Sequence, residues 1–527
     1  MSEPRIHTSE FAPVEVPATP IYETVLAGAA ARGDHPALVD GVTGQTITYA
    51  QLAEMIDRMA AGFAEIGVQP GDVVALHSPN TVLYPVVFYG ASRAGATVTT
   101  LSAMTTAKDM ANQLDDSKAV LVITVGALLS VAVEAAGDRP VWTCDQVEGH
   151  RSVQELLASA GPVPEVQIDA TADVAVLPYS SGTTSLPKGV MLSHANIGVN
   201  LRQIAALRPM TPEDRIIAVL PFFHIYGMTA LMNLPLQAGA TVVVLPRFDL
   251  EQFLSVLERE AITKVFVAPP VVVVFAKHPA VAGHDLSAVT SIVSAAAPLD
   301  AEVAGIAAAR LGVPITQAYG MTELSPGTHL VPIPQEDSAP PGTVGTLVPS
   351  SEARLGDVAS GQDVAVGEEG EIWIRGPHRM LGYFGRQEET DTLIDAEGWL
   401  HTGDIGVVDA DGWWFVVDRV KELIKYKGYQ VAPAELEALL LTSPDVADAA
   451  VIGVYDAKGD EVPKAFVVRA PGSSATEDDV LAFVAERAAP YKRVRRVEFI
   501  DAVPKSASGK ILRRELRGKE KAAGVRV

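Results

Sequence analysis

The chain has 527 residues, 48% hydrophobic and 20% charged, which is typical of a globular enzyme too long for one hydrophobic core. Its formal net charge of −23 argues against a broad surface for nucleic acid or anionic membrane. Its single cysteine, Cys144, excludes an intramolecular disulfide and a multi-cysteine metal site. The polar residues after Met1 predict no signal peptide, and the longest apolar run, VFVAPPVVVVFA, is shorter than the ~20 residues that span a bilayer. We expect a cytoplasmic protein of two or more domains without membrane insertion.

From residue 72 onward, short apolar runs alternate with amphipathic ones, as in DVVALHSPN followed by LYPVVFYGASRAG. Strands that alternate with helices predict an α/β fold of parallel sheets covered on both faces. Three polar motifs, YSSGTT, HIYG and YGMTE, each follow an apolar run. Because ligands in such folds bind beyond the carboxyl ends of strands, we expect all three motifs at the same end of one sheet.

After Gly342 the predicted strands become shorter and glycine-punctuated, as in EGEIWIRGP and GWWFVVDR, which indicates a β-rich subdomain. The last part has predicted strands in AAVIGVYD and PKAFVVRA, and a helix in DDVLAFVAERA that Thr476 caps and that ends before Pro490. The charged segment DRVK has no Gly/Ser run and predicts a short hinge. We expect a large N-terminal domain over residues 1–419 and a small α+β domain over residues 420–527.

The segment YSSGTTSLPKGV, residues 179–190, combines hydroxyls, glycines and one lysine directly after a predicted strand. Backbone N–H groups and hydroxyls can surround phosphate oxygens, and Lys188 adds a positive charge. The order is not that of a Walker A loop, because Lys188 precedes Gly189 and a valine follows. An isolated S-S-G-T-T run is more often a surface loop, but with P-K-G at this spacing it predicts a phosphate-binding loop.

Further motifs carry candidate polar residues. In QAYGMTE, Glu323 suits the Mg²⁺ that accompanies nucleotide phosphates, and Tyr319 offers a flat face to a base. In HTGDIG, Asp404 has two acceptor oxygens that suit a ribose diol, although each of these motifs alone fits an ordinary turn. His224 in PFFHIYGM has no triad motif and no H-E-x-x-H around it, so lining or gating a pocket is the favoured role.

The basic residues collect late in the chain, in DRVKELIKYKG, YKRVRRV and PKSASGKILRRELR. Such clusters indicate either a solvated basic surface or a domain that handles a polyanion such as a nucleotide or coenzyme A. Lys510 follows a Ser-Gly loop in the last of them, which on its own is more often a basic tail.

Taken in order along the chain, YSSGTTSLPKGV, HIYG, QAYGMTE, HTGD, DRVKELIKYKGYQVAPAELE and PKSASGKILRR resemble the adenylate-forming superfamily of acyl-CoA synthetases, adenylation domains and firefly luciferases. PFFHIYGMTALMN, LPRFD and SAAAPL look most like 4-coumarate:CoA ligases, including bacterial cinnamate:CoA ligases. The resemblance covers nearly the whole chain. It implies that a carboxylate attacks the α-phosphate of Mg-ATP to give an acyl-adenylate, and that the thiol of coenzyme A then displaces AMP.

The resemblance also implies roles for matching residues. Lys510 matches the lysine that bridges the substrate carboxylate and the α-phosphate, and Lys421 lies at the hinge about which a mobile small domain rotates between half-reactions. Glu323 matches the magnesium ligand. The candidate catalytic residues are Lys510, Lys425, Gln430 and His224. The matches to ATP- or AMP-binding residues are Ser180, Ser181, Gly182, Thr183, Thr184, Lys188, Gln317, Tyr319, Thr322, Asp404, Arg419, Lys421, Lys425 and Lys510, and those to coenzyme A contacts are Arg247, Lys427 and Gly428.

The expected acyl pocket is mostly small and apolar, with Tyr226, Ala230, Val293, Ala296, Ala318, Gly327 and Thr328. Two positions depart from the family: Ser185 replaces the glycine of GTTGLPKG, and Ala318 stands where the plant ligases usually have glycine. Such a pocket suits cinnamate or a hydroxycinnamate and equally a fatty chain, because apolar pockets discriminate weakly between similar shapes. We expect an acid:CoA ligase for a cinnamate-like acid. The alternatives are a medium- or long-chain fatty acid, a carrier protein in place of coenzyme A, and a non-catalytic nucleotide-binding protein on the same fold.

Overall fold

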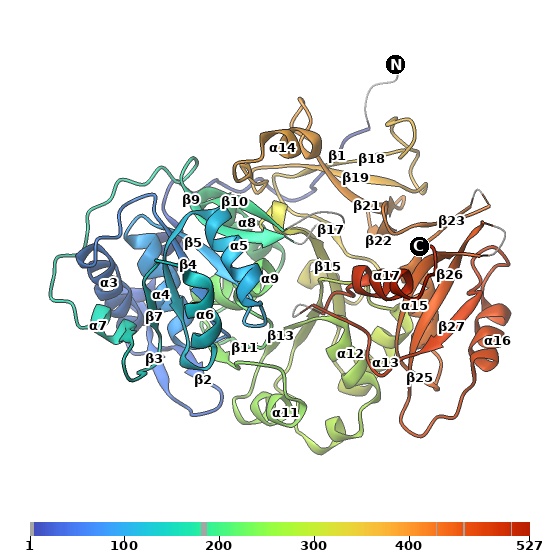
Figure 1. The fold of residues 1–527 in the computed structure, drawn as a ribbon, viewed down its shortest axis with the longest axis horizontal. Helices are drawn as coiled ribbons and strands as arrows, with labels where there is room; N and C mark the ends of the chain where they lie inside the picture. The colour runs from blue at the N-terminus through green and yellow to red at the C-terminus, as the bar shows by residue number, and fades with distance from the viewer. Residues whose placement is uncertain (1–4, 181–186, 428, 457–458, 507–508) are drawn as a thin grey trace.

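The structure is a computed structural model that describes residues 5–180, 187–427, 429–456, 459–506 and 509–527. Two large sheets form the main body, and a β-rich sheet and a terminal lobe complete the molecule (Figure 1). Among the helices of the described ranges, none has the length and apolar character needed to cross a membrane. The cytoplasmic location stays a prediction.

The first sheet has eight strands in the order β20-β10-β9-β5-β4-β6-β7-β8. Its central strands are parallel, as the alternating apolar runs predict, and two antiparallel strands extend one edge. The parallel strands are β4 (Val73–His77), β5 (Thr97–Leu101), β6 (Ala119–Thr124), β7 (Val141–Thr143), β8 (Arg151–Ser152) and β9 (Val174–Ser180), and the edge strands are β10 (Lys188–Ser193) and β20 (Gly382–Tyr383).

The second sheet has nine strands in the order β17-β16-β15-β14-β13-β11-β12-β2-β3. Six of them are parallel: β2 (Pro36–Asp40), β11 (Arg215–Ala218), β12 (Thr241–Val244), β13 (Lys264–Val267), β14 (Ser291–Ser294) and β15 (Ile315–Gly320). Antiparallel strands finish both edges: β3 (Thr46–Thr48), β16 (Gly327–Leu330) and β17 (Thr346–Leu347).

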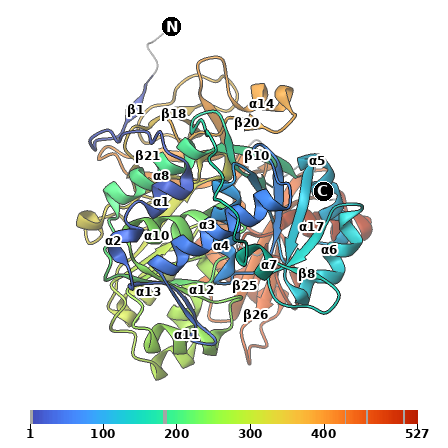
Figure 2. The ribbon, with the colours of Figure 1, turned by 90° about the vertical axis from the view of Figure 1, so that its left-hand side faces the viewer.

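Helices separate and cover the two sheets. Buried apolar side chains of α3 (Tyr49–Glu65), α4 (Leu83–Arg93) and α8 (His194–Leu207) form one core with strands of both sheets. The outer face of the first sheet packs on α5 (Ala107–Ser117) and α6 (Leu129–Ala136), and that of the second on α11 (Leu250–Arg259), α12 (Pro269–Lys277) and α13 (Ala301–Leu311). In Figure 2, α5 and α6 lie opposite α11 to α13, with α3 and α4 between them. Shorter helices are α1 (Ile21–Leu26), α2 (Ala29–Arg32), α7 (Val153–Leu157), α9 (Ile225–Gly227), α10 (Leu234–Ala238) and α14 (Gln387–Leu393).

The expectation that YSSGTT, HIYG and YGMTE end strands of one sheet is wrong. YSSGTT begins at the end of β9 in the eight-stranded sheet, whereas HIYG follows β11 and YGMTE overlaps the end of β15, both in the nine-stranded sheet. Strand and helix alternate in the same way in both sheets, so the sequence pattern does not show where the chain passes from one sheet to the other. The motifs nevertheless meet, because the carboxyl ends of the two sheets border one cavity.

The predicted β-rich subdomain is a five-stranded antiparallel sheet of β1 (His7–Thr8), β18 (Glu352–Gly356), β19 (Gly370–Arg375), β21 (Leu400–Val408) and β22 (Trp414–Arg419). It is followed by a hairpin of β23 (Ile424–Tyr426) and β24 (Tyr429–Val431). The mixed α/β fold and its β-rich part are therefore as expected from the sequence.

The terminal lobe has a three-stranded sheet of β25 (Val446–Tyr455), β26 (Glu461–Arg469) and β27 (Arg496–Phe499), packed with α15 (Pro433–Leu441), α16 (Glu477–Arg487) and α17 (Arg513–Ala522). Thr476 and Asp479 form a reciprocal capping box at the start of α16, and the helix ends before Pro490 as predicted. The lobe has its own apolar core, which fits the expected small α+β domain. The boundary at residue 420 stays a prediction.

Candidate active site

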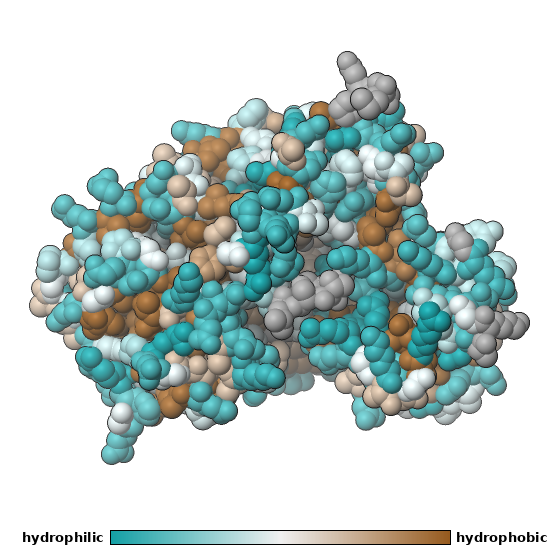
Figure 3. Space-filling view, turned by 45° about the horizontal axis from the view of Figure 1, so that its top comes forward, coloured by the Kyte–Doolittle hydropathy of each residue, from teal (hydrophilic) through white to brown (hydrophobic). Residues whose placement is uncertain are grey.

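A cavity of about 860 Å³ lies where the carboxyl ends of both sheets meet the β-rich sheet and the terminal lobe. Figure 3 shows a hollow between the main body and the terminal lobe, bordered mainly by hydrophilic residues. Residues predicted from separate motifs line this one cavity: Ser180, Lys188, His224, Tyr319, Thr322, Glu323, Asp404, Arg419, Lys421 and Lys510. Six of the predicted acyl-pocket residues line it too: Tyr226, Ala230, Val293, Ala296, Ala318 and Gly327.

Asp404 lines the cavity, and hydrogen bonds hold both of its carboxylate oxygens. It pairs with Arg419 across β21 and β22, and the Arg419 Nε donates to its Oδ1 at 3.1 Å. The Tyr319 hydroxyl donates to its Oδ2 at 2.7 Å from β15. Asp404 is only 6% exposed, so this carboxylate is preorganised beside a guanidinium and an aromatic ring. Such a group suits a ribose diol, as the HTGD motif indicates.

Glu323 is buried, and one of its oxygens accepts two hydrogen bonds. The Ser180 hydroxyl donates to Glu323 Oε1 at 3.0 Å, and the Tyr383 hydroxyl donates to the same oxygen at 2.8 Å. In the part of the chain that the structure describes, no three His, Cys, Asp or Glu residues are grouped as a metal site. Glu323 lines the cavity next to Ser180 and fits Mg²⁺, which takes one or two protein carboxylates and completes its shell with phosphate and water oxygens.

Lys188 forms an ion pair with Glu389 of α14, and its ammonium lies 4.9 Å from the centre of the Tyr383 ring. Tyr383 and Glu389 also line the cavity, and sequence reasoning missed both. Tyr383 stands on the two-residue strand β20, which pairs with β10 next to Lys188. The surrounding sequence, LGYFGRQEET, contains no pattern that distinguishes these residues from an ordinary surface turn.

Lys510 enters the cavity from the terminal lobe on a loop with its own hydrogen bonds. Its backbone N–H donates to the Ser506 hydroxyl at 3.1 Å, and its carbonyl accepts from the Ser506 N–H at 2.8 Å. Burial and the nearby Arg419 guanidinium lower the pKa of Lys510 to about 8, although neighbouring carboxylates act in the opposite direction. The side chain is therefore a cation at neutral pH in a region that anions would fill.

His224 also lines the cavity, and its Nδ1 accepts a hydrogen bond from the Tyr226 N–H at 3.3 Å. Burial, reinforced by the ammonium of Lys510, lowers the pKa of His224 to about 4. The imidazole is therefore neutral near pH 7. This geometry supports a positional role at the cavity wall.

The acyl end of the cavity is built from apolar side chains on neighbouring strands. Phe266 of β13 and Val293 of β14 line it, and the Tyr226 hydroxyl lies 3.4 Å from the carbonyl oxygens of Val267 and Val293. Because side chains alternate along a strand, Lys264 lies on the same face as Phe266. Ser291 and Val293 likewise lie on one face of β14. The side chains that follow the apolar wall toward the amino ends of these strands are therefore polar.

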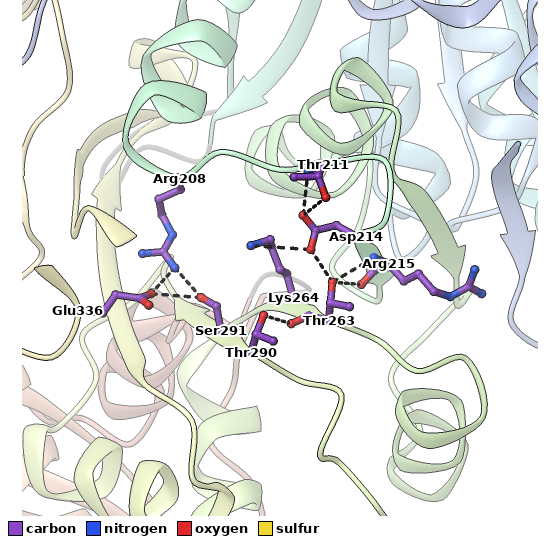
Figure 4. Close-up of polar contacts among 9 residues, drawn as sticks. All are labelled: Arg208, Thr211, Asp214, Arg215, Thr263, Lys264, Thr290, Ser291 and Glu336. Atoms are coloured by element: carbon purple, nitrogen blue, oxygen red, sulfur yellow. Dashed lines mark hydrogen bonds and ion pairs between the residues drawn. The ribbon is translucent and has the colours of Figure 1, made fainter. Parts of the chain in front are cut away.

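Figure 4 shows this polar layer at the amino ends of the strands. The buried Arg208 guanidinium contacts Glu336 Oε1 and Ser291 Oγ, each at 2.5 Å. The Lys264 ammonium lies 3.8 Å from Asp214 Oδ1. This layer lies one step beyond the cavity-lining Phe266 and Val293, toward the amino ends of β13 and β14, and a buried ion pair that loses one partner is costly.

Two predicted residues lie on neighbouring elements but outside the cavity lining. The Gln317 amide oxygen accepts the Leu299 N–H at 3.0 Å and holds the loop after β14. The Thr328 hydroxyl is buried and donates to the Tyr319 carbonyl at 3.1 Å. Both side chains therefore stabilise the backbone next to the cavity without lining it.

Four further predicted residues, all within the described ranges, do not line the cavity. Arg247 is exposed after β12, and Lys425, Lys427 and Gln430 are exposed on the hairpin β23–β24. The ammonium of Lys427 lies 3.7 Å from Asp460. Ser181, Gly182, Thr183, Thr184, Ser185 and Gly428 lie outside the described residues.

Comparison with known proteins agrees with this geometry. Residues 26–384 match the model of the AMP-binding enzyme family, and residues 435–510 match the AMP-binding enzyme C-terminal domain. The chain is 41% identical over 514 residues to 4-coumarate--CoA ligase 5 of Oryza sativa subsp. japonica, covering 96% of this chain and 95% of that protein. It is 40% identical over 521 residues to peroxisomal OPC-8:0-CoA ligase 1 of Arabidopsis thaliana, covering 96% and 95%.

Among solved structures, the anthranilate CoA ligase AuaEII in complex with anthranoyl-AMP superposes with a TM-score of 0.89 at 25% identity. The match covers 97% of this chain and 99% of that one. The two family models together span both the main body and most of the terminal lobe. The chain therefore belongs to the family of AMP-binding enzymes.

Proposed function

We propose that the protein is an ATP-dependent acid:CoA ligase that forms an acyl-adenylate and then an acyl-CoA thioester. The observation that carries this proposal is that Lys510 lies in the same cavity as the phosphate-side residues Ser180 and Lys188 and the apolar acyl pocket. A cation at this position can offset the repulsion between a carboxylate and the α-phosphate, which is the main electrostatic obstacle to the first step.

The two steps follow from the chemistry of a carboxylate, which is a poor electrophile until it carries a good leaving group. A carboxylate oxygen attacks the α-phosphorus of ATP, and the bond between the α-phosphorus and the bridging oxygen breaks to release pyrophosphate. The sulfur of coenzyme A then attacks the acyl carbon, the thiol gives up its proton, and AMP leaves with the oxygen that came from the acid. Asp404 and Arg419 would orient the nucleotide, and Lys188 would exchange Glu389 for phosphate oxygens.

Glu323 and the adjoining Ser180 are the residues that would hold Mg²⁺ with the nucleotide phosphates. The ion supplies positive charge that offsets the charge of the phosphates when it is bound. In the structure, Tyr383 and Ser180 orient the Glu323 carboxylate through its Oε1.

We further propose that the acid is aromatic and cinnamate-like. The lining is apolar and partly small, with Ala230, Ala318 and Gly327. The Arg208–Glu336 ion pair contacts Ser291, two residues before the cavity-lining Val293 on β14. A long alkyl chain that extended in this direction would meet a buried ion pair, which a compact aryl group would not reach. A fatty acid is the second candidate, because the chain also resembles a ligase named for OPC-8:0.

A panel of acids separates these candidates. The protein is incubated with ATP, Mg²⁺ and coenzyme A, and AMP release is measured with cinnamate, 4-coumarate, benzoate, octanoate and palmitate. We expect the highest kcat/KM with cinnamate or 4-coumarate. AMP release with octanoate or palmitate but not with the cinnamates rejects the aromatic proposal. Acid-dependent AMP release that requires a carrier protein rejects coenzyme A as the acceptor.

A further inference from the structure

The helix α15 of the terminal lobe is held at both ends by residues outside the lobe. At its amino end, Asp418 Oδ2 of β22 accepts the Ala434 N–H at 2.9 Å. At its carboxyl end, the Lys277 ammonium, at the last residue of α12, donates to the Leu441 carbonyl at 2.8 Å. The main body therefore contacts α15 with a carboxylate at one end and a cation at the other.

These contacts match the polarity of the helix. The first N–H groups and the last carbonyl groups of a helix lack partners within it, and its ends carry partial positive and negative charge, respectively. Pro433 has no N–H, so the Ala434 N–H is the first donor that α15 presents. Asp418 satisfies that donor, and Lys277 satisfies one of the last acceptors. Reversing either charge would oppose the helix dipole.

The helix α12 also contacts the lobe at its other end, beside the loop that carries Lys510. Gly509 has φ +85°, and a Cβ at this position would lie 2.9 Å from the Cβ of Ala268, the residue before α12. The backbone next to Lys510 thus packs closely on the start of α12. Both ends of α12 contact the lobe, and α12 and α15 are neighbours in Figure 1.

A buried ion pair connects α15 to the Lys510 loop within the lobe. Arg513 begins α17, three residues after Lys510, and its Nη2 donates to Glu437 Oε2 of α15 at 2.6 Å. Its Nε also donates to the Val451 carbonyl at 3.2 Å. Arg513 also interacts electrostatically with Asp418 of β22, so the network joins α15, the start of α17 next to Lys510, and the main body.

We propose that Lys277 and Asp418 are positioning residues that hold α15 by its two ends and thereby keep Lys510 in the cavity. The inference rests on the proposed function for its link to a reaction step. In this orientation Lys510 lies in the cavity while Lys425 and Gln430 are exposed outside it. The contacts of Lys277 and Asp418 with α15 therefore support adenylate formation and not thioester formation.

Lys277 provides the cleaner test, because it is exposed and is not part of the cavity lining. Each half-reaction is measured separately: adenylate formation as cinnamate-dependent exchange of pyrophosphate into ATP, and thioester formation from supplied cinnamoyl-adenylate and coenzyme A. We expect K277E to lower kcat of adenylate formation about tenfold and K277M about threefold, with little change in KM for ATP or cinnamate. We expect K277R to restore the wild-type rate and both weakened variants to retain the thioester step.

The matched control is K108E, which makes the same charge change on the exposed surface of α5. It should leave both half-reactions unchanged. Equal slowing of both steps by K277E, or equal slowing of adenylate formation by K108E, overturns the inference. A rate of adenylate formation in K277E equal to that of the wild type overturns it as well.

A second measurement needs no substrate and so separates failure of this inference from failure of the proposed function. Cys144 is buried, so spin labels can be attached selectively to cysteines introduced at the exposed positions Glu251 of α11 and Glu477 of α16. We expect K277E to move part of the main distance population between the labels to other distances. An unchanged distribution in K277E contradicts the inference even if cinnamate is a substrate. If the wild type activates no acid while K277E shifts the distribution of distances between the labels, the proposed function fails. The role of Lys277 in holding α15 is then still supported.

Discussion

The Lys510 loop and the hairpin β23–β24 are both basic parts of the terminal region, yet the structure places them in opposite environments. Lys510 lies in the cavity near Arg419, where its pKa is lowered to about 8. Lys425 and Lys427 are exposed on the hairpin and line no part of the cavity. Charge pattern alone does not distinguish these segments. The orientation of the terminal lobe decides which basic residue faces the substrates.

The largest expected effect comes from removing the cation in the cavity. We expect K510A to lower the rate of adenylate formation about 10²–10³-fold, because the repulsion between the acid and the α-phosphate loses its fixed counter-charge. Thioester formation from supplied acyl-adenylate should stay within about twofold of the wild-type rate. K521A, on the exposed end of α17, serves as the control. Equal loss of both steps in K510A would remove the distinction between the two segments.

For the hairpin β23–β24 we expect the reverse pattern with a smaller effect, namely loss of thioester formation and retention of adenylate formation. We expect K425A to lower thioester formation about tenfold to hundredfold and to leave adenylate formation within about twofold, since Lys425 lies outside the cavity in this orientation. Pyrophosphate exchange and thioester formation from supplied adenylate measure the two steps. A slower exchange reaction in K425A would show that the hairpin already acts in the first step.

The pH dependence of kcat/KM should follow the charge of Lys510. A lysine with a lowered pKa is cationic below that pKa and loses its charge as the pH rises through it. With the pKa of Lys510 at about 8, kcat/KM for the acid should fall about tenfold for each pH unit well above 8. His224, with a pKa of about 4, should contribute no change between pH 6 and 9. K510R should lose this decline because a guanidinium stays charged, and a decline that persists in K510R assigns it to another group.

Periodicity predicted the class of fold, because strands buried on both faces appear as continuous apolar runs separated by amphipathic segments. It did not predict that β9 and β15 belong to different sheets, because that depends on long-range pairing. The same limit applies to the site. Glu323 and Asp404 occupy recognisable motifs, whereas Tyr383 and Glu389 reach the cavity only because β20 pairs with β10.

Hydrogen bonds explain the two predicted residues that miss the cavity lining. The Gln317 amide oxygen accepts the Leu299 N–H, and the Thr328 hydroxyl donates to the Tyr319 carbonyl, so both side chains are used within the protein. A motif match therefore identifies the right segment, and tertiary contacts decide which of its side chains face the cavity.

The most direct test of an acyl-adenylate intermediate is the fate of the oxygens of the acid. Cinnamate with both carboxylate oxygens replaced by ¹⁸O is converted with ATP, Mg²⁺ and coenzyme A, and the AMP, pyrophosphate and thioester are analysed by mass spectrometry. Attack of the carboxylate on the α-phosphate predicts one ¹⁸O in each AMP, one in the thioester and none in pyrophosphate. Unlabelled AMP, or label in a phosphate product other than AMP, would contradict an acyl-adenylate intermediate.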